Sequence, residues 1–152
     1  MLETKIGGLY KIEAVNAKTG KKRLLADWFP NLITNIGLDR IATNADFMSY
    51  CHVGTNSTTP TINDTALRTF VGSTNTITTS TYTVNSTSPY YASFIRVYRF
   101  NAGIAIGNLS EVGIGWSATG TGSVLFSRAL ILDSYGNPTT ITFLSDEYLD
   151  VT

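Results

Sequence analysis

The sequence predicts an all-β fold: an antiparallel β-sandwich, jelly-roll-like, with one or two short helices. Residue types that favour strands, above all Thr, Tyr, Phe, Val and Ile, are plentiful along the chain. Strand-like segments recur at spacings of about 10–15 residues, each bounded by turn residues, which is typical of sandwiches and barrels. The 152 residues are also enough to bury a core, so we expect a single domain over residues 1–152.

An antiparallel hairpin is the first expected element. Residues 9–15 alternate polar and apolar side chains, residues 22–29 can return beside them, and Gly20 can take the positive φ that the turn needs. We expect residues 1–27 to project as a hairpin that contacts another subunit, or to end in a solvated tip. Its candidate contact residues are Lys18, Lys21 and Lys22. Nucleic acid is not an expected partner, because the 11 basic and 11 acidic residues balance.

Short helices are expected at two places in the first half of the chain. Residues 33–41 repeat apolar side chains at a helical spacing, and Asn35 is the expected N-cap because its side chain can accept from the first free amides. Residues 63–70 predict a second short helix or a wide turn, capped by Asn63 or Asp64.

Residues 71–93 form a stretch without a charged side chain. Its centre, residues 76–84, is rich in Thr and predicts an edge strand or an ordered arm, whereas a flexible linker would be rich in Gly and Ser. An uncharged strand is suited to pairing with a neighbouring subunit. We therefore treat Ile77, Tyr82 and Val84 as candidate subunit contacts.

The last third of the chain carries the clearest strand pattern. Residues 107–116, 124–133 and 139–144 predict three strands of one sheet, joined by turns rich in Gly, Asn and Pro.

Glu111 lies in the first of these strands and is expected to face an arginine across the sheet. Arg128 is the proposed partner, with Arg96 as the other possibility, so the pair is interpreted as a structural ion pair. An acid–base pair of Glu111 with Asp133 is the less favoured alternative.

Cys51 and His52 are neighbours in a predicted strand. Neighbouring side chains in a strand point to opposite faces, so we expect one to pack inward and the other to face solvent or a subunit. This arrangement does not favour a nucleophile–base pair. His52 is also the only histidine, and no second one exists to complete a zinc site.

Other polar and aromatic groups receive structural interpretations. Asp146, Glu147 and Asp150 lack the pattern of a calcium loop, and a solvated strand end or a subunit contact is favoured. Trp28 and Trp116 are expected to pack in the core rather than to line a sugar-binding groove. We therefore expect no catalytic residues, no metal and no cofactor.

A set of segments covers most of residues 28–151: 28–39, 51–55 with Thr59 and Pro60, 63–67, 108–116, 125–131 and 137–142. The segment from Asn108 to Trp116 is the most specific of them. Together these segments resemble a family of tailed-bacteriophage virion proteins that includes small tail-fibre and fibre-anchoring proteins. None of them is a catalytic motif, so the resemblance implies a role and not a reaction.

The resemblance implies a structural protein of the virion, made in the bacterial cytoplasm and assembled with other phage structural proteins. It favours a tail, collar or baseplate protein that anchors or forms fibres, in a symmetric homo-oligomer with a trimer preferred. The alternatives are a head decoration (cement) protein and a carbohydrate-binding module that contacts host surface glycans. No membrane partner is expected, because no run approaches the roughly 18–20 apolar residues of a membrane helix.

Overall fold

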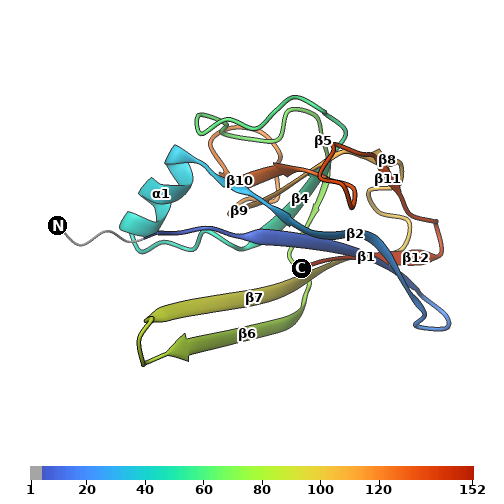
Figure 1. The fold of residues 1–152 in the computed structure, drawn as a ribbon. Helices are drawn as coiled ribbons and strands as arrows, with labels where there is room; N and C mark the ends of the chain where they lie inside the picture. The colour runs from blue at the N-terminus through green and yellow to red at the C-terminus, as the bar shows by residue number, and fades with distance from the viewer. Residues whose placement is uncertain (1–4) are drawn as a thin grey trace.

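Two antiparallel five-stranded sheets face each other in the computed structural model, which describes residues 5–152 (Figure 1). The first sheet has the order β2-β1-β12-β7-β6 and the second the order β3-β10-β9-β4-β5, while β8 and β11 form a separate two-stranded sheet. The predicted antiparallel, sandwich-like all-β class is confirmed.

The strands of the first sheet are β1 (Leu9–Asn16), β2 (Lys22–Pro30), β6 (Ile77–Asn85), β7 (Tyr91–Phe100) and β12 (Glu147–Val151). Those of the second are β3 (Leu32–Ile33), β4 (Tyr50–Gly54), β5 (Phe70–Thr74), β9 (Glu111–Gly115) and β10 (Leu125–Leu130), and the small sheet contains β8 (Asn108–Leu109) and β11 (Ile141–Thr142).

The core lies between the two large sheets. The alternation of β1 turns Tyr10, Ile12 and Ala14 inward, where they are buried against apolar side chains of the second sheet such as Val112. The Tyr10 hydroxyl lies 2.6 Å from Ser127 Oγ on β10, so a buried hydrogen bond also joins the two layers. The sandwich is therefore held by a continuous apolar core that is crossed by the Tyr10–Ser127 hydrogen bond.

The N-terminal hairpin belongs to the first sheet. β1 pairs with β2 on one side and with β12 on the other, and only the turn between β1 and β2 extends beyond the sheet (Figure 1). Asn16 Oδ1 accepts from the amides of Lys18 and Thr19, and Gly20 adopts the positive φ expected of it, 71°. The first four residues of the expected 1–27 hairpin lie outside the described residues.

Helix α1 (Asn35–Ala42) begins one residue away from the expected cap, because Thr34 and not Asn35 is the N-cap. Thr34 is buried, and its Oγ1 accepts from Gly37 N at 3.0 Å while donating to Leu125 O at 2.6 Å. The hydroxyl thus caps the helix and ties it to β10. Among residues 5–152, α1 is the only helix, and none is long and apolar enough to span a membrane.

Two other expectations, the second helix and the three-stranded C-terminal sheet, are corrected by the structure. Residues 63–70 form turns that lead into β5, so the wide-turn alternative holds and the second helix is wrong. In the last third, β9 pairs with β10 as expected, but residues 139–144 supply β11, which pairs with β8 in the small sheet. The three segments therefore do not form one sheet.

Residues 77–97, which we call the arm, form a two-stranded ribbon outside the two-layer body. β12 pairs with β7 only from Tyr98 to Phe100, so residues 91–97 pair with β6 alone. β6 is the outermost strand of its sheet, as the edge-strand interpretation predicted. Figure 1 shows the ribbon standing apart from the rest of the molecule.

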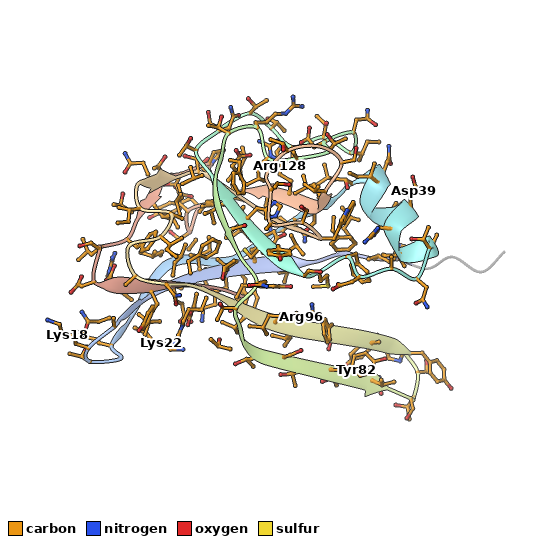
Figure 2. The ribbon with its side chains drawn as sticks, turned by 180° about the vertical axis from the view of Figure 1, so that it is seen from behind. Lys18, Lys22, Asp39, Tyr82, Arg96 and Arg128 are labelled. Carbon is orange, nitrogen blue, oxygen red and sulfur yellow. The ribbon has the colours of Figure 1, made fainter. Side chains whose placement is uncertain are left out.

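We predict that Gly37→Ala destabilises the protein, although alanine normally favours a helix interior by about 1 kcal/mol. A Cβ at Gly37 would lie 2.4 Å from Phe126 O, so α1 would have to move away from β10. Overpacking of this kind costs about 1–3 kcal/mol, measurable by thermal or urea unfolding. The matched control is Asp39→Ala on the exposed face of α1 (Figure 2), which leaves the stability within about 0.5 kcal/mol. Equal stability of both variants would contradict the close approach of α1 and β10.

Candidate functional site

A fully buried ion pair joins β9 and β10. Arg128 Nε donates to Glu111 Oε2 at 2.7 Å, and neither side chain has measurable solvent exposure. Arg128 lies opposite Gly113 in the register, so Glu111 reaches it diagonally across the sheet. The partner considered as the alternative, Arg96, instead donates from Nη1 to Met48 O.

Asp64 is a third buried member of this cluster. Its Oδ2 accepts from Arg128 Nη1 at 2.8 Å, while Arg128 Nη2 donates to Thr58 O at 2.9 Å. Burial alone would raise the pKa of Asp64, but hydrogen bonds from Thr61 and Arg128 outweigh it and hold the pKa below its usual range. The sequence indicated Asp64 only as a cap. The missed signal is Arg128 itself, because an arginine in a fully buried strand requires more than one acceptor.

The Glu111 carboxylate also fixes the loop between β4 and β5. Oε1 accepts from Thr69 N at 2.8 Å and from Asn56 N at 3.4 Å, and Oε2 accepts from Arg68 N at 3.3 Å. Asp133, its proposed acid–base partner, binds backbone amides of its own turn through Oδ1. Both carboxylates are thus occupied in structural hydrogen bonds.

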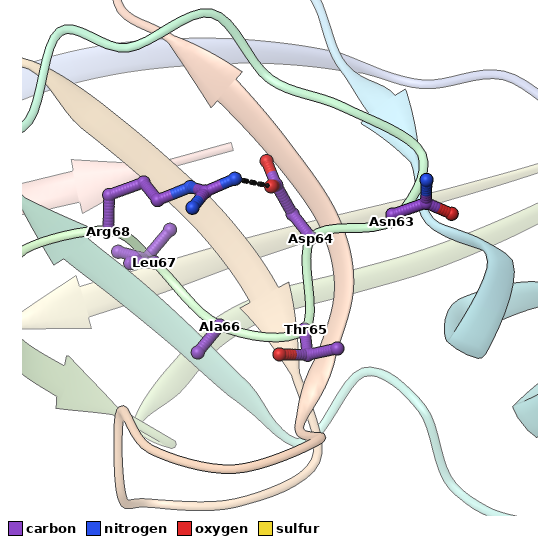
Figure 3. A pocket seen from close by; sticks show the side chains of 6 residues that line it. All are labelled: Asn63, Asp64, Thr65, Ala66, Leu67 and Arg68. Carbon is purple, nitrogen blue, oxygen red and sulfur yellow. Dashed lines mark hydrogen bonds and ion pairs between the residues drawn. The ribbon is translucent and has the colours of Figure 1, made fainter.

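A small pocket of about 220 Å³ opens inside this loop (Figure 3). Figure 3 shows Arg68 beside it, with Nη2 2.7 Å from Asp64 Oδ1. Asp64 therefore meets two guanidinium groups, and its charge is balanced within the chain. The lining residues are Asn63, Asp64, Thr65, Ala66, Leu67 and Arg68.

Cys51 and His52 do not divide between core and solvent as expected, since both are fully buried. His52 Nε2 lies 2.7 Å from Ser117 O, and its ring meets the edge of Phe70 at 5.5 Å, so this side of β4 is covered too. Burial lowers the pKa of His52 and raises the pKa of the Cys51 thiol. At neutral pH these shifts favour an uncharged imidazole and an unreactive thiol.

Two of the three carboxylates near the C-terminus, Glu147 and Asp150, are not solvated as expected, whereas Asp146 is exposed. Glu147 pairs with Arg23 at 2.7 Å and Asp150 with Arg99 at 2.6 Å, and both acids are buried. Asp146 accepts from Asn16 Nδ2 at 3.2 Å beside the first hairpin. These ion pairs tie β12 to its neighbour β7 and, across β1, to β2. Among residues 5–152, no group of three or more His, Cys, Asp or Glu side chains is placed to hold a metal ion.

The two tryptophans have different environments. Trp28 is 51% exposed on the edge strand β2, so its expected place in the core is wrong. Trp116 packs against the core while Arg40 lies over its ring at 4.9 Å. Trp28 lies in the first sheet, whereas Trp116 directly follows β9 of the second, and the exposed Trp28 is the only candidate of the pair for an external contact.

The lysines expected to contact a subunit lie at the turn end of the first hairpin. Lys18, Lys21 and Lys22 are exposed, and Lys22 Nζ lies 3.8 Å from Glu13 Oε2. Figure 2 shows Lys18 and Lys22 at one end of the molecule and Tyr82 of the arm at the other. The two expected contact regions therefore do not form one surface.

The arm has two unlike faces. Its inner face continues the core-facing side of β7 that carries Tyr98 and Phe100, whereas its outer face points away from the second sheet. The register places all three expected contact residues on the inner face, together with Phe94, which meets Tyr82 edge-on at 6.3 Å. The inner-face residues are Ile77, Ser80, Tyr82, Val84, Ala92, Phe94 and Arg96, and the outer-face residues are Thr79, Thr81, Thr83, Asn85, Tyr91, Ser93, Ile95 and Val97.

Comparisons with known proteins found no relative: no protein-family model, no curated protein and no solved structure matches the chain. The resemblance to phage virion proteins is therefore carried only by the sequence segments described above.

We predict that Arg128→Met destabilises the protein by about 3–5 kcal/mol, because Glu111 loses its counter-charge and Asp64 keeps only Arg68. Urea unfolding measures the effect. The control is Lys22→Met, which removes an exposed lysine from Glu13 and costs at most about 1 kcal/mol. A loss below about 1 kcal/mol for Arg128→Met would show that the cluster does not hold the second sheet.

We also predict that the protein loses stability as the pH falls from 7.5 to about 5. The folded-state pKa of His52 is depressed, so the unfolded chain takes up a proton first. The stabilisation is complete above the unfolded pKa of about 6.5 and is lost as the pH falls through the folded value. Thermal melting across this range measures it, and carboxylates titrate mainly below it.

The control for this pH dependence is His52→Gln, which can still donate to Ser117 O but does not titrate. Its melting temperature is expected to stay nearly constant from pH 7.5 to 5. If the melting temperature of both proteins fell equally with pH, the loss of stability would belong to titratable groups other than His52.

Proposed function

We propose that this chain is a structural component of a tailed-phage virion, a tail, collar or baseplate protein that anchors or forms fibres. The arm is the observation that most supports an assembly role. A two-stranded ribbon by itself is marginally stable in water, and this one exposes large apolar side chains such as Tyr82 and Val84. Such a ribbon gains stability when another protein surface covers it.

The two edges of the first sheet support the same role. Natural edge strands are commonly protected from pairing by charges and proline. β2 carries such groups in Lys22, Arg23, Asp27 and Pro30, whereas β6, with the sequence ITTSTYTVN, contains no charge and no proline. One edge is therefore protected while the other is open to a partner.

The phage setting is supported by the sequence resemblance, and it favours a symmetric homo-oligomer, preferably a trimer, bound to other phage structural proteins. Tail fibres and their attachment points are built from such symmetric parts. A protein of this kind resides in the virion after its synthesis in the bacterial cytoplasm. This role requires no catalytic group, cofactor or nucleic acid contact.

A second candidate function is binding of a host surface glycan. Tyr90 and Tyr91 at the end of the arm are 77% and 56% exposed. Exposed tyrosine rings combine an apolar face with a hydroxyl, a combination suited to a sugar ring. A glycan array that detects binding by the wild type but not by a Tyr90→Ala, Tyr91→Ala double variant would support this second function.

The proposed location predicts labelling of tails in intact particles. Antibodies against the chain, coupled to gold, are expected to label the tail, collar or baseplate of a phage that encodes it. Particles of an unrelated tailed phage are the negative control, and mass spectrometry of purified particles checks the presence of the chain. Labelling of the head surface would instead favour a decoration protein. Absence of the chain from purified particles would overturn the proposal.

A further inference from the structure

We propose that the inner face of the arm is the contact between copies of this chain, packing against the same face of another copy. The inference deepens the proposed assembly role and rests on it for its biological setting. It specifies the partner, another copy, and the face that this partner covers.

The arm has the side-chain pattern of a sandwich layer that lacks its second layer. Along β6, Tyr82 and Val84 point to the inner face, while Thr81 and Thr83 point to the outer face. On the body the same inner side carries Phe100, which is fully buried beneath the second sheet. The second sheet does not extend over the arm, where Tyr82 is 64% exposed. The side of the first sheet that faces the core in the body is therefore exposed to solvent along the arm.

The area of this face fits an interface between copies. An aromatic side chain offers roughly 200 Å², so Tyr82 and Phe94, at 64% and 42% exposure, present about 200 Å². Ile77 and Val84 raise the apolar area to about 300 Å² per copy, or about 600 Å² for two. Because interfaces are a little over half apolar, this corresponds to about 1,000 Å² in total, the lower size of a specific interface.

The charges of the arm favour a second copy over a charged partner. No charged residue lies between 71 and 93, so two arms can meet without placing like charges together. Arg96, at the base of the inner face, lies over the Phe94 ring at 4.6 Å and donates to Met48 O. It is the one charged side chain of this face, so the rest of the face offers an acidic or basic partner no counter-charge.

The geometry of packed sheets describes the resulting contact. Two sheets that pack face to face lie about 10 Å apart with their apolar side chains between them. Two arms in this arrangement bury Tyr82 and Phe94 and leave Thr81 and Thr83 in water. A twofold rotation relates the two arms, because the same face is used by both copies and each face covers the other.

The test compares inner-face and outer-face variants of neighbouring residues. We expect the wild-type chain to form a dimer in light-scattering-coupled size exclusion. Tyr82→Asp is expected to raise the dissociation constant about 30-fold or more, as for a hot-spot residue, because it places an unpaired charge in the contact. Thr83→Asp, one residue along the same strand, leaves the assembly within about threefold of wild type. Unchanged circular dichroism and melting of the monomer show that the body stays folded.

A cross-linking experiment provides a second measurement. Tyr82→Cys is expected to join two chains through a short bismaleimide, whereas Thr81→Cys on the outer face is not. The natural Cys51 is buried, which keeps the background low. A monomeric wild type up to about 100 μM, or equal effects of the inner and outer variants in both assays, would overturn the inference. If particles contain the chain as a monomer, the proposed contact between copies is overturned but the virion role is not. If the chain forms the inner-face oligomer but is absent from particles, the virion role is overturned and the contact stands.

Discussion

The guanidinium of Arg128 is buried in the middle of β10, and its hydrogen bonds determine the path of the chain around it. A buried arginine is tolerated only with partners that match its charge and its donors. Glu111 comes from the neighbouring strand, but Asp64 and Thr58 come from the loop between β4 and β5. The loop must therefore fold back over the second sheet, and Glu111 holds it there by accepting from its backbone amides as well. One buried charge thus organises a strand pair and a long loop.

This constraint also affects what covers the arm. The loop from residue 56 to 69 is held on the second sheet, on the opposite side of the molecule from the arm (Figure 1). β12 ends its pairing with β7 at Tyr98, so it does not support the outer half of that strand. Among the described residues, the longest irregular loop is thus committed elsewhere, and the arm depends on its own two strands. The core-facing side of the first sheet is covered by the second sheet in the body, whereas on the arm no other part of the described chain covers it.

The sequence predicted local features better than spatial neighbours. The strand class, the first hairpin and the edge position of residues 76–84 follow from side-chain periodicity and turn residues, which are local signals. The three-strand sheet failed because residues 139–144 pair according to the path of the chain, which periodicity does not encode. His52 was misplaced because alternation assumes that one face of the strand is exposed to solvent, whereas β4 is an interior strand whose two faces are both covered. Asp64 was missed because its role depends on a residue 64 positions away.

The composition of the arm has a physical consequence for assembly. Thr, Val and Tyr are stiff or bulky residues that favour extended backbone, and β6 consists largely of them. These residue types limit the conformational freedom of the free ribbon, so less conformational entropy is lost on association than for a disordered segment. Along β6, Thr81 and Thr83 make the outer face hydrophilic, whereas Tyr82 and Val84 make the inner face apolar. A ribbon whose two strands are already paired can thus form a specific contact from a small area, which a flexible tail of the same length could not do at equal cost.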